Sequence, residues 1–435
     1  MDSSLLAIAL LGEALGPLSW LEVALLVVVA ILAFMIWVLT HHKPCRYGGE
    51  PDTTIIEGLR AVAGSTHSQI LSGNAATLVR DADFFDIVCD DIARAQRSVH
   101  LETYLWVDGD ATARVVAALS DAARRGVAVR VLVDALGGSK LESGTAKELR
   151  DAGCDLHRFR RWRLVNFGRF NVRDHRKIVT VDGMTAIVGG HCMHDRWMKD
   201  TDDARQCRDI SVRIRGPVVS SVQSVFLENW QEVTDQLFVD DTTFPEIAPQ
   251  GEINAHVAYV HADNCASSVQ VLHHLAISFA KERIRIQNPY FLPNPRGARA
   301  LKRAARRGVD VRIMTPSVEA SDSPVVQRAS HFLYRGMLEA GIRIFEYQPT
   351  LLHQKVITID GVWCGIGSSN FDDRSFEIND EVTVGLADPG LVAELDAGFD
   401  HDALQCQERT LKEWATRSRS ERLLSAICYL FDEQL

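Results

Sequence analysis

The feature that most constrains this fold is a short pattern that occurs twice. Residues 174–192 read DHRKIVTVDGMTAIVGGHC, and residues 353–370 read HQKVITIDGVWCGIGSSN. In each copy a His and a Lys stand two positions apart in a run rich in Val, Ile and Thr, which predicts a β-strand with both side chains on one face. Asp-Gly then predicts a tight hairpin turn. The matched positions are His175 and His353, Lys177 and Lys355, Asp182 and Asp360, Gly190 and Ser368, and Cys192 and Asn370.

Other segments repeat in the same order around the two hairpins. The matched pairs are residues 98–105 with 284–291, 122–131 with 304–313, and 209–214 with 381–386. Their strand–helix–strand alternation predicts an α/β fold of two pseudo-symmetric halves, each a mixed sheet flanked by helices, with the paired hairpins facing each other. We expect the first half at residues 78–240, the second at residues 254–410, and a C-terminal helix at residues 411–435.

The N-terminal region contains a long apolar run at residues 18–40, whose one charged residue lies near its start. This run predicts a transmembrane helix within a membrane anchor at residues 1–42, followed by a linker at residues 43–77. Lys43 and Arg46 follow the helix, which predicts a single-pass protein of the cell (inner) membrane with the catalytic region on the cytoplasmic side. A buried core helix is the alternative, and a cleaved signal peptide is not favoured because no basic residue precedes the run.

The net charge and the cysteine content indicate which partners and which redox compartment to expect. The 435-residue chain has a formal net charge of -10, which argues against a general nucleic-acid binder. Its nine cysteines include no CxxC pair and their number is odd. We therefore expect them to be mostly reduced, as in a reducing compartment.

Two imidazoles that face one another, each beside a lysine, suit the exchange of a phosphodiester bond. One His can attack phosphorus and form a phosphohistidine, while the other protonates the leaving alkoxide and then deprotonates the incoming alcohol or water. The lysines and Asn370 would hold the phosphoryl oxygens, so no metal or other cofactor is predicted. Asp209 and Glu381 would each bind the far nitrogen of one His and fix its tautomer. The predicted catalytic residues are His175, Lys177, Asp182, His353, Lys355 and Asp360, and the predicted phosphate-binding or supporting residues are Asn370, Ser368, Gly190, Asp209 and Glu381.

Some of these positions also have a structural interpretation. Asp182 and Asp360 each precede Gly in a predicted turn, so turn chemistry explains them almost as well as catalysis does. His191 and His194 flank Cys192 and suggest metal ligation, but the sequence offers no further well-spaced ligands beside them.

The motif H-x-K-x4-D, present twice and followed by Gly-Gly or Gly-Ser, resembles that of the phospholipase D superfamily over about residues 78–405. Four segments are similar to bacterial cardiolipin synthases in particular: NVRDHRK at 171–177, NPYFLP at 288–293, FEYQPTLLHQK at 345–355 and GSSNFDDRSFEINDE at 367–381. The resemblance implies transfer of a phosphatidyl group onto phosphatidylglycerol with release of glycerol. It also implies that His175 is the nucleophile and His353 the acid/base, which the residues alone do not distinguish.

The chain departs from that family in two respects. Cys192 stands where the family usually has Asn, and a thiol is a weaker hydrogen-bond donor than a carboxamide. One spanning helix is predicted, where some cardiolipin synthases have two.

A basic and aromatic segment at residues 157–177 fits a lipid substrate, because arginines interleaved with aromatic rings favour an anionic membrane surface. Its members are Arg158, Phe159, Arg160, Arg161, Trp162, Arg163, Phe167, Arg169, Phe170, Arg173 and Arg176. A solvated charged loop and a groove for single-stranded nucleic acid are the alternatives.

Together these features predict a membrane-anchored phosphatidyltransferase of the cardiolipin synthase type, with one active site built by both halves and a ping-pong mechanism. Its expected partners are phosphatidylglycerol and the membrane, with no nucleic acid, and no oligomeric state is predicted. One alternative is a hydrolase of the same superfamily, either a phospholipase D or a phosphodiesterase. The other is a membrane scaffold with a decayed site, which the intact His, Lys and Asp of both copies argue against.

Overall fold

The computed structural model describes residues 19–40, 49–161, 171–198, 207–260 and 267–430. The chain divides into two units, Met1–Arg46 and Tyr47–Leu435. The first unit contains helix α2 (Trp20–Thr40), which agrees with the helix predicted over residues 18–40. None of the described helices combines the length and the apolar character that a membrane crossing requires, so the predicted spanning segment is not found.

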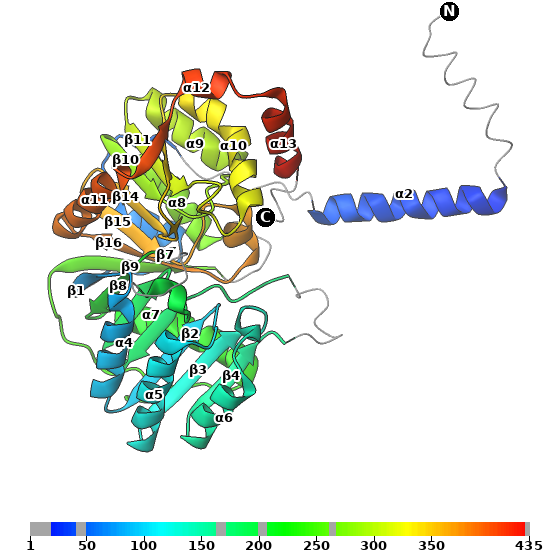
Figure 1. Ribbon diagram of the computed structural model, residues 1–435. Helices are drawn as coiled ribbons and strands as arrows, with labels where there is room; N and C mark the ends of the chain where they lie inside the picture. Colours follow the sequence, from blue (N-terminus) through cyan, green and yellow to red (C-terminus); the bar gives the residue numbers. More distant parts are fainter. Residues whose placement is uncertain (1–18, 41–48, 162–170, 199–206, 261–266, 431–435) are drawn as a thin grey trace, which may run out of the picture. The chain divides into compact units, whose positions relative to one another are not determined.

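The second unit is built on one continuous sheet of 15 strands (Figure 1). From the centre outward, one half contains β1 (Leu71–Arg80), β8 (Ile210–Arg215), β6 (Thr185–Gly189), β5 (Ile178–Val181), β2 (Ser98–Thr103), β3 (Ala128–Asp134) and β4 (Asp155–Phe159). The other contains β9 (Ile253–Tyr259), β16 (Val382–Ala387), β15 (Trp363–Gly367), β14 (Val356–Ile359), β10 (Arg283–Gln287), β11 (Asp310–Pro316), β12 (Arg343–Tyr347) and β17 (Cys406–Arg409). The two orders correspond strand for strand except for β17, and β1 pairs antiparallel with β9 where they meet.

Each half of the sheet mixes parallel and antiparallel pairs, as predicted. In the first half β2, β3 and β4 are parallel neighbours, while β5, β6 and β8 pair antiparallel. The second half repeats this with β10, β11 and β12 parallel and β14, β15 and β16 antiparallel. A separate two-stranded sheet pairs β13 (Leu351–Leu352) with β7 (Cys207–Arg208), one strand from each half.

Helices pack on the sheet and form three main hydrophobic clusters. The helices of the first half are α4 (Asp83–Arg94), α5 (Asp110–Arg124), α6 (Ser143–Asp151) and α7 (Val219–Thr234), and those of the second are α8 (Ser268–Phe279), α9 (Pro295–Arg306), α10 (Pro324–Leu338) and α11 (Pro389–Ala403). The repeated Ala-Ala-Arg-Arg-Gly segments end α5 and α9, and their glycines, Gly126 and Gly308, adopt φ of 90° and 95°, which favours glycine. One cluster joins α7 and α11 to the central strands of both halves, so the halves share a core.

Two predicted boundaries are wrong. The linker predicted at residues 43–77 contains helix α3 (Leu59–Ser65) and most of β1, because Ile55, Leu59 and Val62 are buried in the same cluster as α8. The C-terminal helix predicted at residues 411–435 is two helices, α12 (Leu411–Ala415) and α13 (Arg419–Tyr429), because the Ser418 side chain caps a new helix start. Residues 431–435 lie outside the described residues.

Candidate active site

The two histidine hairpins have the same backbone geometry. β5 and β6 are joined at Asp182-Gly183, and β14 and β15 at Asp360-Gly361. The φ angles are 53° and 66° in the first turn and 52° and 72° in the second, so both central residues are left-handed, as in a type I′ turn. The predicted hairpins are therefore confirmed, with the same turn in both halves.

The carboxylates of these turns bind backbone rather than the imidazoles. Asp182 accepts hydrogen bonds from the N–H groups of residues 96–98, the shortest at 2.7 Å. Asp360 accepts from the N–H groups of residues 281–283 at 2.8 to 2.9 Å. Each carboxylate thus ties the start of a parallel strand to a hairpin turn. The structure does not bring Asp182 or Asp360 together with the histidines, which agrees with the turn interpretation.

Each catalytic candidate histidine is held by the backbone of the opposite half. The N–H of His175 donates to the carbonyl of Asp380 at 3.0 Å, beside a parallel bridge between Asp174 and Asp380. The N–H of His353 donates to the carbonyl of Arg208 at 2.8 Å, next to the β13–β7 pair. Backbone hydrogen bonds therefore join the two halves at both histidines.

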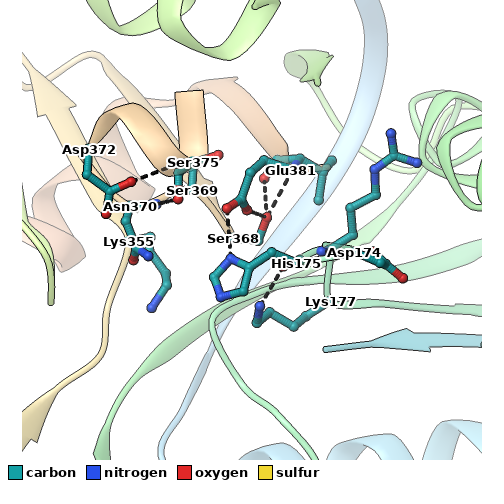
Figure 2. A network of polar contacts seen from close by, with 12 residues as sticks. Asp174, His175, Lys177, Lys355, Ser368, Ser369, Asn370, Asp372, Ser375 and Glu381 are labelled. Carbon is teal, nitrogen blue, oxygen red and sulfur yellow. Dashed lines mark hydrogen bonds and ion pairs between the residues drawn. The ribbon is translucent and has the colours of Figure 1, made fainter. Parts of the chain in front are cut away.

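The imidazole rings are also oriented across the halves. Nδ1 of His175 lies 2.7 Å from Oε1 of Glu381, and the two side chains point toward one another in Figure 2. Nδ1 of His353 lies 2.8 Å from Oδ2 of Asp209. Both carboxylates are fully buried. Because Nδ1 donates to a carboxylate, each ring keeps its proton there and has Nε2 as the basic nitrogen. The predicted carboxylate contacts are present, and they cross from one half to the other.

Burial dominates the electrostatics of this site. It lowers the pKa of both His175 and His353 well below the usual value, and the nearby lysines lower it further. The imidazoles are therefore neutral near pH 7 and able to act as nucleophile or base. Burial raises the pKa of Glu381 to about 8 and also raises that of Asp209, although cationic neighbours oppose both shifts.

The two lysines make different contacts. Lys355 donates to the carbonyl of His353 at 2.7 Å and lies 3.0 Å from Nε2 of the same ring. Lys177 donates to the carbonyl of His175. Burial lowers the pKa of Lys355 to about 8, which places its proton within reach of exchange near neutral pH. Lys355 is thus placed to share a proton with His353.

Gly190 and Ser368 occupy matched positions and support the two carboxylates. A Cβ atom at Gly190 would lie 2.4 Å from Oδ1 of Asp209, so only glycine admits that carboxylate. Ser368 instead donates its hydroxyl to Oε2 of Glu381. A short carboxylate faces glycine in one half, and a longer one faces serine in the other. These positions therefore act on the imidazoles through the carboxylates.

Asn370 and Cys192 occupy matched positions but have different surroundings. Asn370 is 6% exposed, and the Oδ1 atom of its side chain is buried without a hydrogen-bond partner among the described residues. It lies near Lys355 in Figure 2, where it can donate to a bound oxyanion. Cys192 packs in the hydrophobic cluster of the first half, and burial raises the pKa of its thiol. The site therefore has a carboxamide donor on one side and an inert thiol on the other.

Two aromatic residues that the sequence analysis did not single out complete the site. Trp197, on the short helix η3 (Asp195–Trp197), donates Nε1–H to Oδ2 of Asp209 at 2.8 Å and packs its ring edge-on against His353. Tyr104 packs edge-on against His175, with ring centroids 5.2 Å apart. Tyr104 could have been found from the sequence, because it follows a repeated strand and is matched to Tyr290 in the second copy. Trp197 lies between two repeated segments and belongs to neither, so it has no such signal.

Three arginines of the basic segment do not face the surface that the sequence suggested. Arg176 is fully buried and binds Glu228 at 2.6 Å and the carbonyls of Val225 and Val260. Arg160 and Arg173 are also largely buried beside carboxylates. The membrane-facing interpretation is wrong for these three arginines, because long-range partners in the fold hold them inside. Residues 162–170 lie outside the described residues.

His191 shows no sign of the metal ligation that its neighbours suggested. Its Nδ1 lies 2.7 Å from the hydroxyl of Ser211, and its Nε2 lies 3.0 Å from the carbonyl of Asp81. Within the described part of the chain, no group of three His, Cys, Asp or Glu side chains is arranged to hold a metal ion.

The chain is similar in sequence to several proteins named as cardiolipin synthases. Cardiolipin synthase A of Pseudomonas fluorescens is 32% identical over 367 residues, covering 84% of this chain and 76% of that protein. A cardiolipin synthase of Geobacillus thermodenitrificans is 33% identical, covering 83% of this chain and 74% of that protein. The crystal structure of a phosphatidylserine synthase from Haemophilus influenzae has the same fold, with a TM-score of 0.66 and 12% identity over 87% of this chain and 100% of that one.

The domain family described as "Cardiolipin synthase, PLD-like domain" matches residues 88–230 and 275–403. These two segments contain both histidine hairpins and the carboxylates that orient the imidazoles. Because the match covers more than half of the sequence, the chain belongs to this family of phospholipase D-like cardiolipin synthase domains.

Proposed function

We propose that the protein is a phosphatidyltransferase that makes cardiolipin from two molecules of phosphatidylglycerol. The observation that carries this proposal is the pair of imidazoles, each held at Nδ1 by a buried carboxylate of the opposite half. Such a pair supplies two basic Nε2 atoms in one site, one to form a covalent bond and one to move protons. The family and the names of the relatives supply the lipid chemistry.

In the first step Nε2 of His175 attacks the phosphorus of a bound phosphatidylglycerol. The N–P bond forms, the bond from phosphorus to the glycerol oxygen breaks, and His353 gives that oxygen a proton. Lys355 supports this assignment, because its ammonium lies 3.0 Å from Nε2 of His353 and can supply the proton that a buried imidazole holds weakly. The contact of Lys177 with the backbone carbonyl leaves His175 the better nucleophile.

In the second step the terminal hydroxyl of another phosphatidylglycerol attacks the phosphatidyl-histidine. His353 accepts the hydroxyl proton, the new O–P bond forms, and the N–P bond to His175 breaks to give cardiolipin. Lys177, Lys355 and Asn370 stabilise the negative charge that develops on the phosphoryl oxygens. Asp182 and Asp360 act only by fixing the hairpins.

The substrate is a bilayer lipid, so we propose that the enzyme works at the cell membrane. Lys43 and Arg46 follow the apolar helix in the sequence, which favours the cytoplasmic side for the catalytic unit. The cysteines of the described residues are free, which agrees with a reducing compartment.

A product assay tests the proposal. Purified full-length protein is incubated with phosphatidylglycerol in mixed micelles, and cardiolipin, phosphatidic acid and glycerol are measured. We expect cardiolipin and glycerol in equal amounts. Phosphatidic acid with glycerol and without cardiolipin would instead identify a hydrolase, and the absence of all three products would contradict both activities on this lipid.

A further inference from the structure

A cavity of about 170 Å³ is lined by residues of both halves, and the mechanism above leaves it unused. Its polar lining includes the side chains of Arg196, Glu319, Asp322 and Gln348. Leu351 and Cys207, the first residues of the paired strands β13 and β7, form part of its wall. The cavity is therefore built from both halves, as the catalytic site is.

The walls of this cavity adjoin groups around His353. Leu351 precedes His353 by two positions, and Arg196 precedes Trp197, whose ring packs against the same imidazole. Asp322 accepts a hydrogen bond from the hydroxyl of Tyr290 at 2.6 Å, and its charge opposes the lowering of the pKa of His353 by burial. No such link connects the cavity lining to His175 among the described contacts. The cavity thus lies on the acid/base side of the site.

The chemistry of the lining selects against acyl chains and simple anions. A fatty acyl chain would leave charged and amide groups without water or partners. A bare phosphate would meet two carboxylates and one guanidinium, with net repulsion. A small alcohol with several hydroxyls can donate to Asp322 and Glu319 and accept from Arg196 and Gln348. The lining therefore fits a polyol.

The proposed reaction uses a binding site for an alcohol in both of its steps. The leaving alcohol and the attacking alcohol exchange protons with the same group, His353, so they occupy the same side of phosphorus in turn. In the proposed conversion both alcohols are glycerol moieties, one released from the donor and one belonging to the acceptor lipid. A single glycerol subsite beside His353 therefore serves both steps.

We propose that this cavity is the alcohol subsite and binds a glycerol head group, with Asp322 as its main specificity determinant. The inference rests on the proposed function. The bound hydroxyl gives its proton to Nε2 of His353 as its oxygen bonds to phosphorus and the N–P bond to His175 breaks. Asp322 holds a second hydroxyl of the same glycerol, which is absent from a simple alcohol such as ethanol.

Competition between two acceptor alcohols tests this inference. Cardiolipin in mixed micelles serves as the donor, and transfer to labelled glycerol or to ethanol is measured as phosphatidylglycerol or phosphatidylethanol. In Asp322→Asn we expect KM for glycerol to rise by about tenfold or more and the use of glycerol relative to ethanol to fall by a similar factor. Loss of the charge near His353 affects both alcohols alike, whereas only glycerol has the second hydroxyl that Asp322 binds. The amide still accepts from Tyr290, so the fold around the cavity is kept.

Two further variants make the test decisive. Ala320→Leu places bulk in the cavity wall and is expected to reduce use of glycerol while sparing ethanol. Asp90→Asn, on the exposed surface of α4, is the matched control and is expected to leave both alcohols unchanged. An unchanged ratio of glycerol to ethanol use in both cavity variants would overturn the inference alone. Failure of the wild-type protein to transfer to either alcohol would overturn the proposed function and the inference with it.

Discussion

The two histidine hairpins share one backbone design but differ in what surrounds them. Behind His175 the adjoining side chains are charged and buried, with Asp174, Asp380 and Arg176 in the interior. Behind His353 the corresponding strand contributes Leu352, and Gln354 stands where the first half has Arg176. The residue before one imidazole is therefore a buried carboxylate, and the residue before the other is a buried leucine, yet both rings reach the same contact with a carboxylate.

The matched pairs explain how two environments give one geometry. In the first half Gly190 leaves room for Asp209, and Trp197 donates to that carboxylate. In the second half the longer side chain of Glu381 is met by the hydroxyl of Ser368. What the two halves retain is the distance from carboxylate to Nδ1, at 2.8 and 2.7 Å. The comparison indicates that this contact, rather than any one residue around it, is what the fold requires.

The halves also divide the chemistry. The carboxamide of Asn370 and the ring contact of Lys355 belong to the second half, where the first has a buried thiol and a lysine bound to backbone. In the proposed mechanism the first half therefore supplies the nucleophile, and the second half supplies proton transfer and an oxyanion donor.

The largest expected effect is the loss of turnover on replacement of either histidine, and the covalent adduct distinguishes their roles. His175→Ala removes the nucleophile, so no phosphatidyl-enzyme forms and turnover is lost. His353→Ala leaves the nucleophile but removes proton transfer, which costs about 10²- to 10⁴-fold in kcat. Labelled phosphatidylglycerol and acid-free gel analysis measure the covalent adduct. We expect it in His353→Ala and not in His175→Ala. Full turnover in either variant would contradict a site shared by both halves.

The next effect compares the matched donors. Asn370→Ala removes the carboxamide and is expected to lower kcat by about 10²- to 10³-fold, as loss of one oxyanion donor does. Cys192→Ala removes a thiol from an apolar cluster, so we expect kcat to remain near the wild-type value and the free energy of unfolding to fall by about 1 kcal/mol. Steady-state kinetics and urea unfolding check both. Equal kinetic losses would show that the halves contribute equally to oxyanion binding.

A smaller effect is a narrow bell-shaped dependence of kcat on pH, centred near pH 8. Below about 8 Glu381 is protonated and cannot strengthen the basicity of His175, so activity rises with pH as this carboxyl ionises. Above about 8 Lys355 loses its proton and can no longer supply His353, so activity falls. Profiles of kcat against pH measure both limbs.

Matched variants assign these limbs. Lys355→Arg keeps a positive charge at all relevant pH values and is expected to move the alkaline limb upward by more than about one pH unit, while lowering kcat. Lys177→Arg is the control and is expected to leave that limb in place. Glu381→Gln should abolish the acid limb. An alkaline limb that stays fixed in Lys355→Arg would exclude Lys355 as the group that titrates.

The hairpins and the need for a carboxylate at each imidazole could be predicted from the sequence, because the pattern is local and occurs twice. The crossing of those contacts could not, since it depends on the pairing of β1 with β9 at the centre of the sheet. The burial of Arg176 could not be predicted either. Its partners Glu228 and Val260 are 52 and 84 positions away, so the local sequence shows only a basic residue that would be expected at the surface.

The residues outside the repeated segments were the hardest to predict. Trp197 lies in η3, which has no matched helix of the same type in the second half, where residues 374–378 form a π-helix. Without a second copy there was no pattern to compare. The prediction of a linker at residues 43–77 was wrong for a related reason. Leu59 and Val62 stand in the short helix α3, which has no matched copy in the repeat, and only its packing against α8 shows that they belong to the core.

The smallest expected effect on chemistry comes from Asp182 and Asp360, which the two halves share unchanged. Each carboxylate accepts N–H groups from three consecutive residues, so replacement by Ala leaves these donors without partners and lowers the free energy of unfolding by about 1–3 kcal/mol. Because the two turns have no binding partner in common, the losses in the double variant should add. Urea unfolding measures them, and kcat is measured well below the transition. If both aspartates act only through the hairpins, kcat of the folded fraction stays near that of the wild type in both variants; a large loss in one alone would give that aspartate a part in the reaction and break the equivalence of the two turns.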